Sequence, residues 1–160
     1  EAVDAVRARY VHTGIALPSA QELTAAIPAA WVEGNAQQLH QVVGNILENS
    51  LRYTDAPGRV LISGSINGSE TATAPQRWLE LHIDDSAPTV AAVDLPRIFE
   101  RFYRVEASRS RASGGSGLGL AICQSIVQAH VGRLQASISP LGGLRMTLEL
   151  PLLRMTHEHP

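Results

Sequence analysis

A glycine-rich run that leads directly into a helical pattern stands out in the second half of the chain: GGSGLGLAICQSIVQAH, residues Gly114 to His130. Glycine inside a helix costs about 1 kcal/mol relative to alanine, so its repeated use here needs a compensating reason. A helix N-terminus presents free N–H groups, and glycine lets such a backbone approach an anion closely. The run therefore predicts either a phosphate-binding loop before a helix at Leu118–His130 or an ordinary mobile turn.

A second strong helical pattern lies in the first half of the chain, at Ala36–Tyr53. Its apolar residues form one face. The opposite face carries a polar stripe: Gln41, Asn45, Glu48, Asn49 and Arg52. Amide oxygens suit Mg²⁺, which takes few protein ligands and completes its octahedron with water and phosphate oxygens. The stripe predicts a metal–phosphate surface, although a merely solvated helix face would have the same polarity.

The remaining pattern predicts short elements around these two helices. Two central strands are expected at Arg59–Ile66 and Trp78–Ile83, joined by the polar loop Asn67–Gln76, and a closing hairpin at Arg133–Ile138 and Leu144–Leu150. A short helix near the start, strands at Ile15–Leu17 and Leu23–Ile27, and a short helical piece at Leu95–Tyr103 complete the expectation. This order predicts an α+β fold, a two-layer α/β sandwich whose mixed sheet has helices packed on one face. Residues 1–151 form one domain, and 152–160 a C-terminal tail.

Composition narrows the classes of protein to consider. With 160 residues, 44% of them hydrophobic, the chain is typical of one globular domain. No apolar run is long enough to span a bilayer, and a net charge of −2 argues against a nucleic-acid partner. The single cysteine, Cys123, lies in an apolar helical pattern, so we expect a buried, unreactive thiol. Because the chain starts at Glu1, we expect a piece of a longer or processed protein.

Two further segments carry candidate chemistry. The stretch IDDSAPTV, residues 83–90, places Asp85 at a strand end, where it can accept a hydrogen bond from a ligand amine, although these residues also favour a plain turn. The segment before Gly114 is rich in arginine: Arg97, Arg101, Arg104, Arg109 and Arg111. A basic loop that precedes a glycine-rich helix start predicts contact with phosphate, or else only a solvated loop.

Taken in order, these motifs resemble the catalytic ATP-binding domain of bacterial sensor histidine kinases, which has the Bergerat fold. The segment NILENSLRYT (45–54) resembles the family's N box, and DSAPTV (85–90) its first glycine box. The segment FERFYR (99–104) resembles the F box, and GSGLGLAI (115–122) the second glycine box. The DSAP form is similar to a variant found in some envelope-stress sensor kinases. The resemblance covers roughly residues 10–151 and implies that domain 1–151 transfers the γ-phosphate of ATP to a histidine.

The resemblance implies a role for each matched residue. Asn49, with Asn45 beside it, would bind Mg²⁺, and Asp85 would accept a hydrogen bond from the adenine amine. The implied catalytic residues are Glu48, Asn49 and Arg104. Glu48 would orient the incoming histidine, or it is simply a carboxylate on the helix surface. The other implied nucleotide contacts are Arg52, Tyr53, Ala87, Arg101, Gly115, Gly117, Leu118 and Gly119.

Two departures from the family pattern matter. The first glycine box usually reads D-x-G-x-G, but here Ala87 and Thr89 occupy the glycine positions. A β-branched residue such as Thr89 resists positive φ and would crowd a ligand passing over it, so weak nucleotide binding is one expectation. None of the six histidines lies in an H-E-x-x-T-P phosphoacceptor motif or in a metal-binding spacing. The substrate histidine is therefore expected on a dimerisation domain outside this chain.

The resemblance also implies partners and a place in the cell. The partners are ATP, the histidine-bearing dimerisation domain of the same protein and a cognate response regulator, with a homodimeric full-length protein and no nucleic acid. The chain would be a soluble, cytoplasmic part of an inner-membrane sensor. Three alternatives stay open: a water-using ATPase, disfavoured because Asn45 stands where a glutamate base would be; an anti-sigma-type serine kinase; and a nucleotide-binding regulatory module with weakened or lost catalysis.

Overall fold

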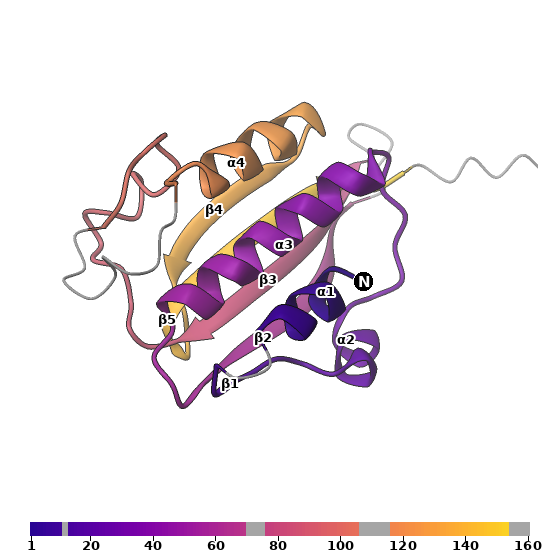
Figure 1. Cartoon of the computed structure of the whole chain (residues 1–160). Coiled ribbons are helices and arrows are strands. Elements are labelled where there is room, and N and C mark those ends of the chain that lie inside the picture. Colours follow the sequence, from indigo (N-terminus) through magenta and orange to yellow (C-terminus); the bar gives the residue numbers. More distant parts are fainter. Residues whose placement is uncertain (11–12, 70–75, 106–115, 154–160) are drawn as a thin grey trace, which may run out of the picture.

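The computed structural model describes residues 1–10, 13–69, 76–105 and 116–153. These ranges contain both helices and strands (Figure 1). Their order is α1 (Ala2–Arg9), β1 (Ile15–Ala16), α2 (Ala20–Ala26), α3 (Ala36–Tyr53), β2 (Gly58–Ser69), β3 (Gln76–Ser86), α4 (Gly119–Ala129), β4 (Arg133–Ile138) and β5 (Gly142–Pro151). The two long helices, the central strand pair and the closing hairpin lie where the sequence predicts them.

The sheet is mixed, with the strand order β1-β2-β3-β5-β4. The short β1 runs parallel to β2, and every other neighbouring pair is antiparallel. In Figure 1, α1, α3 and α4 lie across one face of this sheet. The structure confirms the predicted α+β fold with a mixed sheet and helices on one face.

The core lies between the helices and that face of the sheet. It follows from two periodicities, one of about 3.6 residues in the helices and one of two in the strands. The buried set includes Val42, Ile46, Leu47 and Leu51 of α3, Cys123 and Val127 of α4, and Leu144, Met146, Leu148 and Leu150 of β5. The expected burial of Cys123 is confirmed, and burial raises the pKa of its thiol to about 11.

The N-terminus of α3 is fixed to the C-terminus of α4. The Asn35 side chain caps α3 by accepting from the Gln38 N–H at 3.0 Å. The Asn35 N–H in turn donates to Nε2 of His130 at 3.0 Å, and Nδ1 of His130 lies 2.7 Å from the Ile126 carbonyl. The His130 ring fits here because Gly34 has no side chain; a Cβ at that position would lie only 2.4 Å from the ring. The two helices that carry the candidate motifs are therefore held in register.

Two of the expected elements are wrong. The strand predicted at Leu23–Ile27 is mostly helix α2, because Ser19 and Glu22 form a capping box that starts a helix. The helical piece predicted at Leu95–Tyr103 is a series of turns. There the Phe102 N–H donates to the Gly117 carbonyl at 2.9 Å, so a tertiary hydrogen bond replaces the one that would continue a helix.

The chain stays paired just beyond β5. The last strand ends at Pro151, one residue beyond the predicted end at Leu150, and Leu152 then forms an antiparallel bridge with Val32. The Leu153 N–H donates to the Trp31 carbonyl at 2.8 Å. The rest of the predicted tail, 154–160, lies outside the described residues. Among the helices that the structure describes, none has the length and apolar character needed to cross a membrane.

Candidate functional site

A cavity of about 350 Å³ lies between α3, the segment after β3 and the start of β5. We call it the inner compartment. A second space of about 330 Å³, the polar compartment, adjoins it. The two compartments share a set of lining residues: Asn49, Arg52, Tyr53, Ile98, Tyr103, Arg104 and Leu120. A ligand with an apolar end and a charged end can therefore occupy both.

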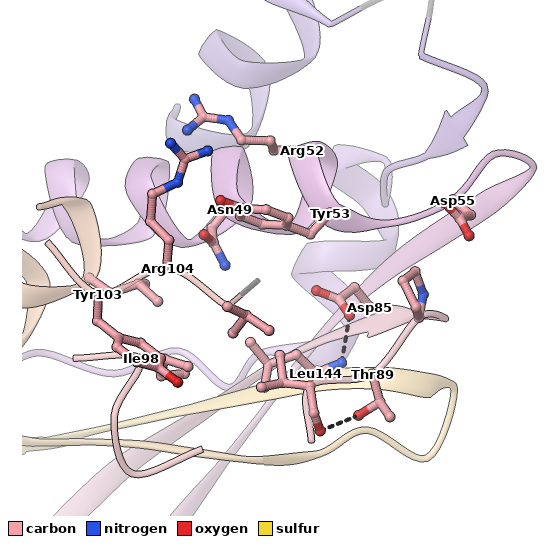
Figure 2. Close-up of a pocket in the computed structure, with 14 residues that line it drawn as sticks. Asn49, Arg52, Tyr53, Asp55, Asp85, Thr89, Ile98, Tyr103, Arg104 and Leu144 are labelled. Atoms are coloured by element: carbon pink, nitrogen blue, oxygen red, sulfur yellow. Dashed lines mark hydrogen bonds between the residues drawn. The ribbon is translucent and has the colours of Figure 1, made fainter. Parts of the chain in front are cut away.

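The polar stripe of α3 forms one wall of this site. Asn45, Glu48 and Asn49 lie at helical spacing on the side of α3 away from the core, and all three line the polar compartment. Arg104 faces them from the segment after β3, and its guanidinium lies near that of Arg52 in Figure 2. Two guanidinium groups close to two amides form a wall suited to a hydrated cation and an anion bound together.

Glu48 already has a partner. Its Oε1 forms an ion pair with Nη1 of Arg9 on α1, and the Glu48 side chain is 26% exposed. This pairing holds the carboxylate at the edge of the polar compartment and offsets its charge. Arg52 and Arg104 also line this compartment and carry positive charge. The suggested role of Glu48 toward an incoming histidine stays a prediction.

Asp85 provides a buried acceptor in the inner compartment. Its side chain points into the cavity from the end of β3, and the residue is 4% exposed (Figure 2). Oδ1 accepts the Leu144 N–H at 2.6 Å. Burial raises the pKa of Asp85, and hydrogen bonds from Leu144 and Ser50 oppose that rise. A buried carboxylate with remaining acceptor capacity favours a ligand that brings an N–H donor.

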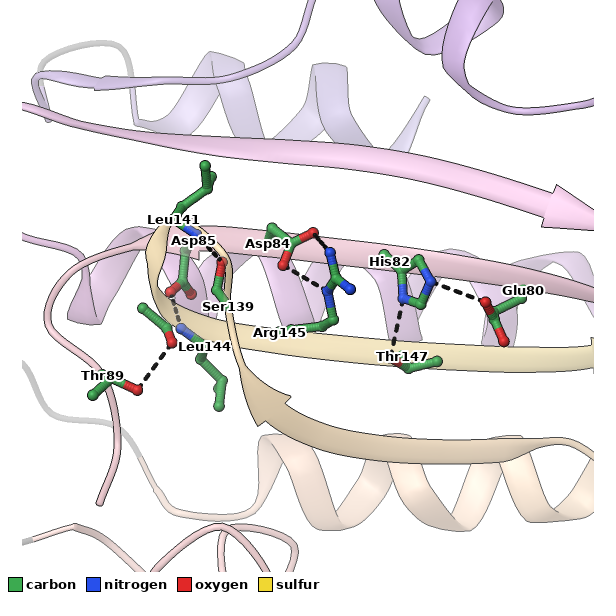
Figure 3. Close-up of polar contacts among 11 residues, drawn as sticks. Glu80, His82, Asp84, Asp85, Thr89, Ser139, Leu141, Leu144, Arg145 and Thr147 are labelled. Carbon is green, nitrogen blue, oxygen red and sulfur yellow. Dashed lines mark hydrogen bonds and ion pairs between the residues drawn. The ribbon is translucent and has the colours of Figure 1, made fainter. Parts of the chain in front are cut away.

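The neighbouring carboxylate has a different role. Asp84 points to the opposite face of β3, since side chains alternate along a strand. It binds Nε and Nη2 of Arg145 on β5, both at 2.8 Å (Figure 3). This bidentate pair fastens β3 to β5 beside the site. Of the two adjacent aspartates, only Asp85 lines the cavity.

Gly143 makes room for Asp85. A Cβ at this position would lie 2.2 Å from Oδ1 of Asp85 and 2.5 Å from its backbone carbonyl oxygen. Sequence reasoning placed this residue only between the two strands of the closing hairpin and so missed this contact. The available signal was a second glycine beyond the one that the turn itself needs.

The glycine-rich run reaches the polar compartment through two of its predicted residues, Gly117 and Gly119. Gly117 has a φ of +68°, and a Cβ there would lie 2.9 Å from Cα of Phe102. Gly119 begins α4, whose N-cap residue Leu118 makes no side-chain capping bond. The conformation of Gly117 and the close approach of Phe102 explain one glycine of the run without any ligand.

Some predicted contacts are not at the cavity. Among the described residues, Ala87, Arg101 and Leu118 line neither compartment, and Gly115 lies outside the described residues. The Ala87 carbonyl instead accepts the Asp55 N–H at 3.0 Å, which fixes the loop to the end of α3. Sequence reasoning did not place the following lining residues in the site: Asp55, Pro88, Val90, Ile98, Tyr103, Val105, Leu120 and Leu144. Most are apolar, and apolar wall residues have no distinctive sequence signal.

Tyr103 is held in place at the junction of the two compartments. Its hydroxyl donates to Oδ1 of Asp94, and this hydrogen bond raises the pKa of Tyr103. The guanidinium of Arg97 lies 4.2 Å from the centre of the ring. The tyrosine is thus fixed from two sides where the compartments meet.

Thr89 does not adopt the positive φ that a β-branched residue resists, whereas the expected crowding of a ligand stays a prediction. Among the described residues other than glycine, positive φ occurs only at Phe102 and Val131. Thr89 lines the inner compartment with an ordinary backbone conformation, and its hydroxyl donates to the Gly143 carbonyl at 2.9 Å. Threonine is therefore compatible with the local backbone where the family pattern has glycine.

An α+β sandwich with a partly apolar, acceptor-bearing compartment beside a polar one lined by two arginines has the features of a nucleotide-binding domain. The sequence model of the family described as "Histidine kinase-, DNA gyrase B-, and HSP90-like ATPase" matches residues 34–154. The chain belongs to this ATPase family, as the catalytic ATP-binding domain of a sensor histidine kinase.

Individual relatives agree with this assignment. The chain is 52% identical over 123 residues to the signal transduction histidine-protein kinase BaeS of Escherichia coli K12, covering 77% of this chain and 25% of BaeS. It is 38% identical over 128 residues to the sensor histidine kinase CpxA of the same strain, covering 79% of this chain and 26% of CpxA. The chain thus spans about a quarter of the length of these curated relatives.

Solved structures show the same fold. The mycobacterial sensor histidine kinase MprB superposes with a TM-score of 0.73 at 27% identity, covering 96% of this chain and 93% of that one. Full-length ShkA in complex with AMPPNP gives a TM-score of 0.72 at 24% identity, covering 96% and 29% of the two chains.

Proposed function

We propose that the chain binds Mg²⁺-ATP across the two compartments and transfers the γ-phosphoryl group to a histidine on a dimerisation domain outside this chain. The observation that carries the proposal is the buried Asp85 side chain in a cavity with mixed polar and apolar walls, which shares Asn49, Arg52 and Arg104 with the polar compartment. The adenine occupies the inner compartment and the triphosphate the polar one. The family supports ATP as the nucleotide.

The residues present fit both groups. In the inner compartment, Ile98, Leu120 and Leu144 offer apolar contact to a base, and Asp85 accepts its exocyclic amine. In the polar compartment, Asn45 and Asn49 offer neutral oxygens to Mg²⁺, which draws its remaining ligands from phosphate and water. Because the amides carry no charge, affinity for the metal depends on the nucleotide being bound as well.

Phosphoryl transfer depends mainly on positioning and charge neutralisation. Mg²⁺-ATP supplies the group that is transferred. Arg52 and Arg104 place positive charge beside the phosphates, and Glu48 orients the incoming histidine from the edge of the polar compartment. Asn45 stands where a water-using ATPase has a glutamate, and an amide cannot take a proton from water. The residues therefore favour transfer to a histidine over hydrolysis.

The wider setting is part of the same proposal. The intact protein is proposed as a homodimeric, inner-membrane sensor whose cytoplasmic catalytic domain is this chain, with a response regulator as the next phosphate acceptor; similarity to the histidine kinases BaeS and CpxA supports the signalling role. The alternative of a regulatory module with weakened or lost catalysis rests on Ala87 and Thr89 in the glycine positions of the first glycine box. Neither residue has a positive φ, so the backbone at these positions does not require glycine.

Calorimetric titration with ATP and GTP, each with and without Mg²⁺, tests the proposal. We expect saturable, Mg²⁺-dependent binding of ATP. GTP should bind about ten- to a hundredfold more weakly, because it presents an acceptor to the buried Asp85 and leaves it unpaired. Absence of saturable ATP binding would contradict the proposal. Steady phosphate release by the chain alone would instead indicate a water-using ATPase.

A further inference from the structure

Two consecutive residues at the start of β5 hold two different walls of the inner compartment. The Leu144 N–H donates to Oδ1 of Asp85 at 2.6 Å, which fixes the acceptor at the end of β3. The Gly143 carbonyl accepts the Thr89 hydroxyl at 2.9 Å, which fixes the loop after β3. Figure 3 shows both hydrogen bonds side by side at the hairpin. The spacing between acceptor and loop therefore depends on one short stretch of backbone.

The loop that Thr89 anchors is a wall of the cavity. Pro88, Thr89 and Val90 all line the inner compartment. The Asp55 N–H holds the start of this loop through the Ala87 carbonyl at 3.0 Å. The hydroxyl of Thr89 holds its middle, and its other contact, to the Val90 carbonyl at 3.4 Å, is longer and lies within the loop itself. The hydrogen bond to Gly143 is thus a side-chain link between the loop and the hairpin.

We propose that Thr89 is a positioning residue for adenine selectivity, which ties the loop at 87–90 to the β4–β5 hairpin and so keeps it at a fixed separation from Asp85. The proposal rests on the proposed function. A glycine in this place would have no side chain to form the tie. The residue that departs from the family pattern thereby supplies a link of its own.

The hydrogen bond between Thr89 and Gly143 matters for selectivity, because Asp85 can distinguish one base from another only if the base cannot move away from it. With the loop in place, a base that brings an acceptor toward Asp85 leaves a buried carboxylate unpaired. With the loop released, the base can move away from Asp85 and relieve that mismatch. Loss of the tie should therefore reduce the preference for ATP over GTP, as well as ATP affinity.

Three substitutions separate the hydroxyl from the shape of the side chain. Thr89→Val keeps the shape and removes the donor, Thr89→Ser keeps the donor, and Thr89→Gly removes both. For Thr89→Val and Thr89→Gly we expect ATP binding about three- to tenfold weaker, the loss of one neutral hydrogen bond, and a smaller ATP-to-GTP ratio. Thr89→Ser should stay within about twofold of the unsubstituted chain, because its hydroxyl can reach the same carbonyl.

The experiment combines calorimetric titration of ATP and GTP with hydrogen exchange in the nucleotide-free chain. The amides of Thr89 and Val90 should exchange faster in Thr89→Val and Thr89→Gly, and Thr89→Ser should restore protection. Unchanged exchange, affinity and selectivity in Thr89→Val would overturn the proposal, as would tighter ATP binding by Thr89→Gly, which indicates crowding. If the unsubstituted chain binds neither nucleotide, the proposed function fails and selectivity fails with it, whereas exchange still reports separately on the tie.

Discussion

Replacing Gly143 with alanine tests whether the start of β5 fixes the position of the Asp85 side chain. The added Cβ would lie 2.2 Å from Oδ1 of Asp85 and 2.5 Å from the backbone oxygens of Asp85 and Ser86. Two of these three atoms belong to the backbone, so a change of side-chain rotamer cannot relieve the contact. Strands β3 and β5 must separate locally, and the 2.6 Å bond from Leu144 to Asp85 is lost or weakened.

The expected cost combines two effects. Overpacking a tight site costs about 1–3 kcal/mol. Losing a hydrogen bond to a buried charged group costs about 1.5–3 kcal/mol more. Gly143→Ala should therefore lower the free energy of unfolding by about 2.5–6 kcal/mol, which corresponds to a fall in Tm of at least about 5 °C for a domain of this size. ATP affinity should fall as well, because Asp85 is displaced.

Thermal and urea unfolding of the nucleotide-free chain measure this cost. Gly44→Ala is the matched control, since it adds the same methyl group in the interior of α3, where a Cβ meets nothing within 4 Å. The control should raise stability by up to about 1 kcal/mol through helix propensity. If Gly143→Ala unfolds at the same temperature as the unsubstituted chain and binds ATP equally well, the start of β5 does not fix the position of Asp85.

Three further substitutions test other parts of the site. Asp85→Asn should abolish the preference for ATP over GTP. Because burial raises the pKa of Asp85, the free energy of unfolding should decrease as pH rises from about 4 through that raised pKa. Urea unfolding of the amide variant should not show this decrease. Asn49→Ala should remove the Mg²⁺-dependent part of ATP binding, measured by calorimetry, and leave metal-free binding nearly unchanged. Arg9→Ala should lower the free energy of unfolding by no more than about 1 kcal/mol, because the Arg9 side chain is 66% exposed, and added salt should shrink the difference.

Each of these expectations has a contrary outcome. If Asp85→Asn leaves both the selectivity for ATP and the pH profile of stability unchanged, Asp85 is not the acceptor that binds the base. If ATP binding by Asn49→Ala depends on Mg²⁺ as strongly as in the unsubstituted chain, Asn49 does not bind the metal. A loss of several kcal/mol in Arg9→Ala would show that the pair with Glu48 is a structural element of the fold.

The sequence predicts the helices well where the apolar pattern is long. The apolar stripe at Ala36–Tyr53 gives the bounds of α3, and the run before His130 gives α4 to within a residue. Both patterns extend over three or more turns, so the periodicity outweighs local noise. The strand at Leu23–Ile27 failed because five apolar-rich residues have no decisive period, and the Ser19–Glu22 capping box, a local signal, decided the outcome.

The site was predictable residue by residue on α3 and unpredictable across the sheet. Spacing on one helix brings Asn45, Asn49 and Arg52 together, and the structure places all three on the cavity. The contact between Asp85 and Gly143 joins positions far apart in sequence through strand pairing. Because the pairing register and its irregularity near Ser86 are tertiary features, no local pattern could indicate that contact.

The most direct test of a nucleotide held between α3 and the start of β5 is a crystal structure of the chain with AMPPNP and Mg²⁺. We predict that the exocyclic amine of the base will lie within hydrogen-bonding distance of Asp85, with the metal on the Asn49 side chain and the phosphates beside Arg52 and Arg104. A nucleotide bound elsewhere, or one whose base makes no contact with Asp85 while the metal leaves Asn49 untouched, would contradict the account.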